Sequence, residues 1–203
     1  MMVQPALALS TTRATWEQAV DRYRLFYPKP DAAARREVDW MAFPAMKPIY
    51  AGLVADVTSL PPTPEQFETA FFAQSNFPRT DAIRWRLLAK FYPSFVAEQH
   101  LALILLERFR HVTYSDREDL AGIDIHLAYR GLAIGIASAI GSDAGRQWEI
   151  VKRVRHPESA DVWLLRLYRL PYEYEVGPFW LHHPDKVEAA VKAFAASILG
   201  SAP

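Results

Sequence analysis

Hydrophobic and polar residues alternate most regularly between residues 120 and 140, which predicts two β-strands joined by a tight turn. On the first strand, apolar side chains occupy every second position: Ile123, Ile125, Leu127 and Tyr129. Arg130 and Gly131 supply a two-residue turn, because glycine tolerates a positive φ angle. Counting outward from this turn places Asp124 opposite Ala137, among small residues on the second face of the hairpin.

Helical periods and capping signals predict helices on both sides of this hairpin. The predicted helices span residues 16–26, 32–41, 64–75, 82–92 with a continuation beyond Pro93 to about 109, 144–155 and 184–199. Further strands are predicted at 111–114, 162–170 and 179–181. Residues 1–14 are expected to be a frayed lead-in, and 43–63, which contains four prolines, a segment without regular structure. The order of elements predicts an α/β core over residues 80–203, preceded by a helical and Pro-rich extension over residues 1–79.

The composition narrows the classes of function. A chain of 203 residues can form one domain with a sizeable core, and a hydrophobic content of 51% argues against disorder. The 23 basic and 23 acidic residues cancel, so the whole molecule has no positive field to attract nucleic acid, although a local patch can still bind it. The absence of Cys excludes disulfides, thiolate metal sites and cysteine nucleophiles. No apolar run is long enough for a membrane span and no signal peptide is recognisable, so we expect a cytoplasmic protein without a membrane partner.

The stretch from Ile83 to Arg130 combines a helix with a Phe-Tyr-Pro break, a long apolar helix, an acidic loop and a Gly-Ile-Asp strand. It resembles the restriction-endonuclease-like superfamily, the PD-(D/E)xK nucleases, and most closely the TaqI-type restriction enzymes. The similarity is best over about residues 80–170. It implies a restriction-endonuclease-like core, a mixed sheet with flanking helices.

The resemblance also implies where an active site would lie. In this superfamily an Asp on the first hairpin strand binds Mg²⁺, a Glu or Gln followed two residues later by Lys lies on the second strand, and a Glu from the preceding helix sometimes assists. Asp124 stands at the position of the metal-binding Asp, and Glu98 is the candidate helix carboxylate. Ala137 and Ala139 stand where the acid and the Lys are expected.

The hairpin is therefore predicted to lack the groups that phosphodiester hydrolysis requires. Carboxylates hold the cation, the cation activates a water molecule, and an ammonium group neutralises charge developing on the phosphate. No Lys occurs between residues 90 and 152, and we expect no ammonium group near Asp124. The first interpretation is a catalytically silent relative of Mg²⁺-dependent DNA endonucleases, without a cofactor, that binds nucleic acid or a protein partner.

Other interpretations stay open. An active Mg²⁺-dependent nuclease requires that catalytic residues have migrated, and the charged candidates on the next predicted helix are Asp143, Arg146, Glu149, Lys152, Arg153 and His156. His126, two residues beyond Asp124, could join it in holding a transition metal. His182 and His183, close to Asp185, suggest a metal site or merely the start of a helix that Asp185 caps.

Partners are suggested by two features. Basic residues that could contact the phosphate backbone of double-stranded DNA are Arg146, Lys152, Arg153 and Arg155. Alternatively, these basic residues belong to a surface helix whose arginines pair with the acidic loop at 116–119 and bind no nucleic acid. The small-residue face of the hairpin could instead pack against a protein partner or a second copy in a homodimer, without any binding to nucleic acid.

Overall fold

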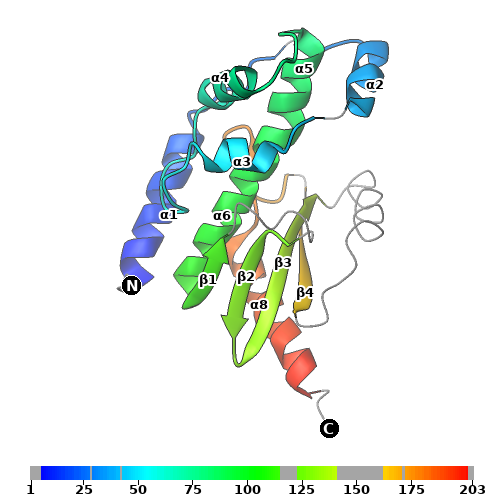
Figure 1. Cartoon of the computed structure of the whole chain (residues 1–203). Helices are drawn as coiled ribbons and strands as arrows, with labels where there is room; N and C mark the ends of the chain where they lie inside the picture. Colours follow the sequence, from blue (N-terminus) through cyan, green and yellow to red (C-terminus); the bar gives the residue numbers. More distant parts are fainter. Residues whose placement is uncertain are drawn as a thin grey trace.

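A computed structural model describes residues 6–27, 29–41, 43–114, 123–140, 162–170 and 172–200. The predicted α/β class is confirmed: a four-stranded mixed sheet in the order β1-β2-β3-β4 is flanked by helices (Figure 1). The strands are β1 (His111–Tyr114), β2 (Ile125–Tyr129), β3 (Leu132–Ile140) and β4 (Trp163–Arg169). A separate two-stranded ribbon joins β5 (Glu175–Val176) to β6 (Phe179–Trp180).

The hairpin of β2 and β3 has the predicted register. Tyr129 pairs with Leu132 and Leu127 with Ile134 in an antiparallel ladder. The turn residues Arg130 and Gly131 have φ angles of 51° and 79°, the left-handed conformation that both central residues of a type I′ turn adopt. Because the side-chain period of a strand is two, this register also fixes which residues lie beside Asp124.

The fourth strand runs parallel to β3, in contrast to the antiparallel pairing of β1, β2 and β3. Ser138 pairs with Leu167 and Ile140 with Arg169, so the carboxyl ends of β3 and β4 lie at the same edge of the sheet. The predicted helix 144–155, which would make this crossover, lies outside the described residues.

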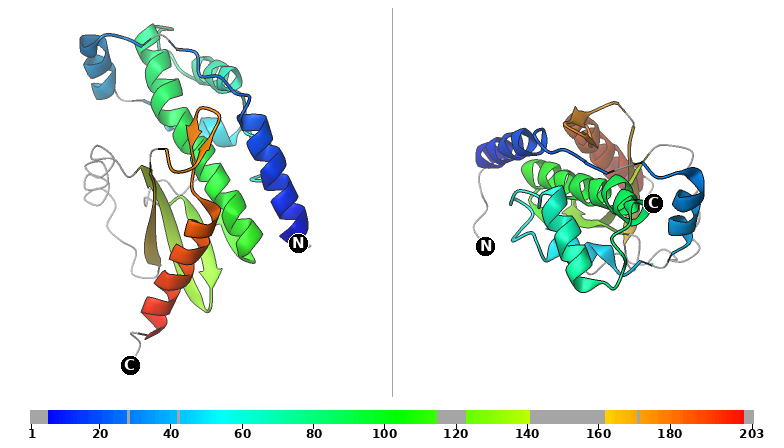
Figure 2. Two further views of the ribbon diagram at one scale, coloured as in Figure 1. Left: turned by 180° about the vertical axis from the view of Figure 1, so that it is seen from behind. Right: turned by 90° about the horizontal axis from the view of Figure 1, so that it is seen from above.

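Two long helices cover one face of the sheet, α6 (Tyr92–Arg108) and α8 (Pro184–Gly200), as Figure 2 shows from behind. Apolar side chains of both helices meet the sheet in one cluster that contains Leu101, Ile104 and Leu105 from α6, with Val187 and Val191 from α8. We refer to it as the sheet cluster. The long apolar helix α6 therefore packs on the sheet through this cluster.

The N-terminal half is helical, with two departures from prediction. It contains α1 (Ala6–Val20), α2 (Ala32–Trp40), α3 (Met46–Ala51) and α4 (Pro64–Gln74). A helix does cover residues 16–20, but the predicted bounds of 16–26 are wrong, since α1 begins at Ala6 within the expected lead-in and ends at Val20. Thr15 does not cap a helix start, because its hydroxyl donates to the Thr11 carbonyl inside α1. The prediction of an irregular segment at 43–63 is wrong where α3 forms. The capping box predicted at Thr63 and Gln66 is present.

Pro93 does not interrupt the helix that leads into α6, although we expected a break there. Helix α5 (Asp81–Arg86) continues through a π-helical turn, η1 (Leu87–Phe91), directly into α6. In this turn the N–H of Tyr92 bonds to the carbonyl of Leu87, five residues earlier. The wider turn accommodates the missing donor of Pro93, so the chain remains helical.

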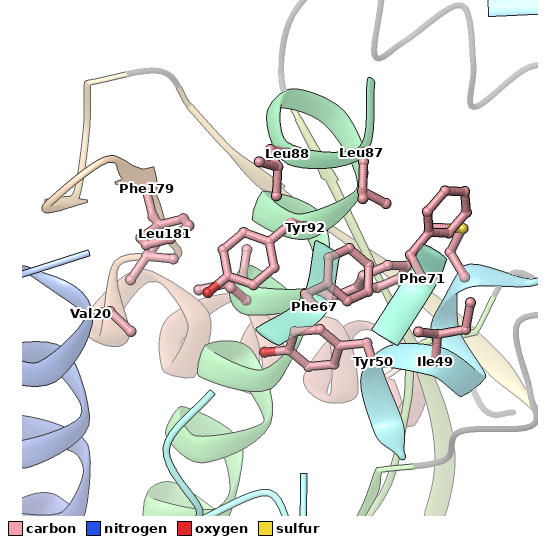
Figure 3. Close-up of a cluster of buried hydrophobic side chains, with 14 of the residues drawn as sticks. Val20, Ile49, Tyr50, Phe67, Phe71, Leu87, Leu88, Tyr92, Phe179 and Leu181 are labelled. Atoms are coloured by element: carbon pink, nitrogen blue, oxygen red, sulfur yellow. The ribbon is translucent and has the colours of Figure 1, made fainter. Parts of the chain in front are cut away.

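A second group of buried apolar side chains, the helical cluster, fills the space between the N-terminal helices and the first half of the long helix. Figure 3 shows Ile49 and Tyr50 of α3, Phe67 and Phe71 of α4, and Tyr92 of α6 packed together. Members of this cluster come from both sides of residue 80. The N-terminal helices therefore share a core with α5, η1 and α6.

Candidate functional site

Three consecutive buried polar residues interrupt the apolar surface of α6 where it passes between the two clusters. Phe95 to Ala97 belong to the helical cluster, and Leu101 and Ala102 belong to the sheet cluster. Between them, Glu98, Gln99 and His100 are buried. Buried polar groups persist only when they find partners, so each of the three identifies a specific contact.

Glu98 faces a lysine and a second carboxylate. The Lys47 ammonium of α3 lies 3.3 Å from Glu98 Oε2 and 3.6 Å from Asp124 Oδ1. The side chains of Lys47 and Asp124 are each 2% exposed, and that of Glu98 is 12% exposed. The two carboxylates therefore converge on one cation, and their oxygens can be no farther apart than the sum of the two distances.

The start of β2 holds Asp124 in place. Its backbone N–H donates to the Ile136 carbonyl at 2.9 Å, which continues the ladder of the hairpin. Its side-chain Oδ2 accepts the backbone N–H of Ser138 at 2.6 Å. With one oxygen bound to β3, the carboxylate can present the other to Lys47. Ala137 and Ala139 are buried, and as alanines they contribute no polar side-chain group to the site.

Lys47 reaches this position because α3 is anchored on either side of it. Met46, Ile49 and Tyr50 are buried in the helical cluster, and these contacts anchor the backbone of the short helix beside the sheet. The Lys47 ammonium also lies 5.6 Å from the ring centroid of Tyr114 on β1, where the electron-rich face of the ring favours a cation.

A buried arginine adds a second positive charge to this region. Arg169, at the end of β4, is 5% exposed and donates to the carbonyls of Pro93 and Trp180 and to the Ser94 hydroxyl. Burial lowers the pKa of Arg169 to about 10, while the carboxylates of Glu98 and Asp124 oppose that shift. At neutral pH the guanidinium is charged, and together with Lys47 it balances the two carboxylates.

His182 connects the segment before α8 to the same strand. Its Nε2 lies 2.8 Å from the Ser138 hydroxyl, the residue whose N–H binds Asp124. Burial lowers the pKa of His182 well below its usual value, and the charge of Arg169 acts in the same direction. A neutral imidazole thus supports the strand that positions the carboxylate.

Gln99 and His100 attach other N-terminal elements to α6. Gln99 accepts the Tyr50 hydroxyl at 2.7 Å and donates to the carbonyls of Val57 and Ser59. His100 Nε2 lies 2.7 Å from Glu17 of α1. Burial lowers the pKa of His100, against the effect of Glu17, so this contact joins a carboxylate to a neutral ring. The same stretch of α6 therefore fixes α1, α3 and the site.

The structure brings together two of the predicted site residues, Asp124 and Glu98, and adds a third. The expectation that no ammonium group lies near Asp124 is wrong, because Lys47 supplies one from the N-terminal half. Sequence reasoning missed Lys47 and Arg169. A signal for Lys47 was available: a single charged residue stands among apolar neighbours in the segment 45–51.

The remaining candidates from the sequence fall into two groups. The basic candidates Arg146, Lys152, Arg153 and Arg155, and the migrated candidates Asp143, Glu149 and His156, all lie outside the described residues. Within the described ranges, no three His, Asp or Glu side chains are close enough to hold a metal ion together. Among the described residues, His126 and Asp124 are therefore joined by no third such ligand, and His182, His183 and Asp185 do not form a metal-binding group. Asp185 is 78% exposed and faces Arg108.

The carboxylate oxygens of the cluster are nevertheless of the ligand type that a divalent cation such as Mg²⁺ takes. Mg²⁺ prefers oxygen ligands, keeps several waters and is commonly bound through one or two carboxylates together with substrate phosphates. Asp124 and Glu98 supply two carboxylates directed at a common point that already holds a positive charge. These two residues would hold the ion.

Two further results concern the chain as a whole. Among the described helices, none combines the length and the apolar content that crossing a membrane requires. Comparison with protein-family models, with curated proteins and with solved structures gave no match to this chain. The functional interpretation therefore depends on the geometry of the cluster itself.

Proposed function

We propose that this protein is a metal-dependent phosphodiesterase that cleaves nucleic acid, with Asp124 and Glu98 as metal-binding carboxylates and Lys47 as the catalytic ammonium group. The single observation that carries this proposal is the position of the Lys47 ammonium between the two carboxylates. Lys47 supplies the ammonium group whose expected absence near Asp124 favoured a catalytically silent protein. The sequence motif is incomplete at Ala137 and Ala139, but a lysine from another element occupies the same surroundings.

The order of elements supports the proposal. Helix α6, the antiparallel strands β1, β2 and β3, and the parallel strand β4 form a mixed sheet with flanking helices, the architecture that the resemblance to restriction endonucleases implies. Asp124 lies directly before β2, the first strand of the hairpin, and Glu98 lies on α6, the helix that precedes the sheet. This order of the two carboxylates agrees with the one that the resemblance implies.

The roles of the residues follow from their chemistry. When bound, the metal ion would supply positive charge and lower the pKa of an attacking water. The water hydroxyl is added to phosphorus, the bond from phosphorus to one sugar oxygen breaks, and the water proton ends on that oxygen. Lys47 would neutralise the charge that develops on the phosphate, while the N–H of Ser138 keeps the Asp124 carboxylate oriented.

A silent protein is the second candidate, and one observation favours it. Lys47 and Asp124 are each 2% exposed, and the four charges of Lys47, Arg169, Glu98 and Asp124 cancel without any bound ion. Such a cluster can serve the fold alone. The protein would then bind nucleic acid or a protein partner without cleaving it.

Cleavage of plasmid DNA and of single-stranded DNA, with Mg²⁺ or Mn²⁺ and with EDTA, separates the two candidates. We expect metal-dependent cleavage that falls by a factor of about 100 or more in Asp124→Asn, Glu98→Gln and Lys47→Gln, on the scale of lost electrostatic stabilisation of a transition state. Lys90→Gln is the matched control, since Lys90 forms an exposed pair with Asp39 at 2.6 Å.

Two results would contradict the proposal. Folded wild-type protein that cleaves neither substrate with either metal would support the silent candidate. Cleavage that survives unchanged in Asp124→Asn would mean that the activity comes from elsewhere. Circular dichroism on each variant establishes that a lost activity is not a lost fold.

A further inference from the structure

The Lys47 ammonium is in contact with both carboxylates that would hold a divalent cation. Its distances of 3.3 Å to Glu98 and 3.6 Å to Asp124 leave the two acids facing one positive group. The surroundings are shielded from solvent, because the Lys47 side chain is 2% exposed. Solvent and salt screen a buried charge only weakly, so the net charge of the cluster decides which ions the cluster can bind.

In the described state this balance is already complete. In their ionised forms Glu98 and Asp124 contribute two negative charges, and Lys47 and Arg169 contribute two positive charges. A divalent ion added to all four groups would leave a buried net charge of about two, which a low-dielectric environment strongly disfavours. One of the protein cations must therefore move away from the carboxylates when the ion binds.

The two protein cations differ in their freedom to move. The Arg169 guanidinium donates to Pro93, Ser94 and Trp180, contacts that fix its planar group. The Lys47 ammonium ends a flexible four-carbon chain on a helix of only six residues. Lysine is thus the group that can leave.

We infer that Lys47 is a resident cation that competes with the divalent metal for Asp124 and Glu98, so that the metal binds only as the ammonium withdraws. The choice of a divalent metal rests on the proposed function, but the competition does not require that the protein cleaves anything. It gives Lys47 two roles in succession: it keeps the site closed to metal when no substrate is present, and it is released to meet the negative charge of a phosphate.

Mn²⁺ binding, measured by calorimetry and by electron paramagnetic resonance without nucleic acid, tests the competition. We expect Lys47→Gln to bind Mn²⁺ at least tenfold more tightly than the wild type, because its amide can contact the carboxylates but carries no charge. Lys47→Arg keeps the charge and should bind no more tightly than the wild type. Lys90→Gln controls for the loss of a positive charge elsewhere, and adding Asp124→Asn to Lys47→Gln should abolish the gain.

The same experiment can overturn the inference. Equal or weaker Mn²⁺ binding by Lys47→Gln, or an equal gain in Lys90→Gln, would mean that the lysine does not compete. If Lys47→Gln is unfolded in EDTA, its folding is titrated with Mn²⁺ instead. Recovery of the native circular dichroism at Mn²⁺ concentrations where NaCl of the same ionic strength has no effect supports competition, and failure to recover refutes it.

These outcomes are independent of the proposed function. A tenfold gain in Mn²⁺ affinity without cleavage by the wild type would support competition and refute the nuclease. Metal-dependent cleavage by the wild type without a gain in Lys47→Gln would support the nuclease and refute competition.

Discussion

Replacing Asp124 by Ala is the most direct test of whether the buried charges stabilise the fold. The substitution removes the carboxylate 3.6 Å from Lys47 and leaves the N–H of Ser138 without its acceptor. Breaking a buried ion pair costs about 3–5 kcal/mol, and an orphaned buried N–H costs about 1–3 kcal/mol. Because Lys47 keeps Glu98, we expect the sum to stay near the lower value, a loss of roughly 4 kcal/mol.

Urea unfolding and thermal unfolding, followed by circular dichroism, measure this loss. In a chain of this size each 1 kcal/mol lowers the Tm by about 2–4 °C, so the Tm should fall by roughly 8–16 °C. Asp39→Ala is the control for exposure, since Asp39 pairs with Lys90 at 2.6 Å but its side chain is 42% exposed. Exposed pairs contribute about 0–1 kcal/mol.

Asp124→Asn separates the two contributions, because an Asn oxygen can still accept the N–H of Ser138 while the charge is gone. We expect its loss to lie between those of Asp124→Ala and Asp39→Ala. If Asp124→Ala and Asp39→Ala lose the same stability within about 0.5 kcal/mol, a typical error of such comparisons, the reasoning about burial is refuted.

Three further predictions concern other parts of the fold. Burial lowers the pKa of His182 below its usual 6.5, so at lower pH the unfolded chain binds a proton that the folded chain does not, and the free energy of unfolding should fall as the pH drops below about 6.5. His182→Gln should reduce the dependence of the urea midpoint on pH between pH 7 and pH 5, and an unchanged dependence would contradict this assignment. Gly177→Ala should cost about 2 kcal/mol or more, because the new Cβ would lie 2.8 Å from the Asp21 Cα at a φ of +55°. Gly131→Ala, with a φ of +79° and open space around it, should cost only about 1 kcal/mol, and equal losses of stability in urea unfolding would refute the clash at Gly177. A fragment of residues 80–203 should show no cooperative urea transition, since it lacks eight of the 18 buried residues of the helical cluster. A sharp transition would mean that the fragment has a sufficient core of its own.

The sheet could be predicted from the sequence because its signals are local. The alternation along β2, the Arg130-Gly131 turn and the parity of strand positions together determine the register, and with it the place of Asp124. Helix α4 could be predicted for the same reason, since its start is marked by a capping box of Thr63 and Gln66 with Pro64 in the first turn, a signal that depends on a few adjacent residues.

The candidate site could not be predicted in the same way, because its members come from distant parts of the chain. Lys47 lies in a proline-rich segment, and only the burial of Met46, Ile49 and Tyr50 in the helical cluster directs it at the sheet. Its role follows from tertiary packing, which no spacing along the chain encodes. Similarly, the break expected at Pro93 is absent because the preceding turn widens to π-helical geometry.

The delivery of Lys47 by α3 has a consequence for the biosynthesis of the protein. The lysine is translated before either carboxylate, and Asp124 is the last of the three residues to be made. A chain that ends before residue 124 thus holds at most two of the three groups. Under the proposed function, hydrolytic capacity would arise only after the segment that carries Asp124 has been made and has folded against α3 and α6.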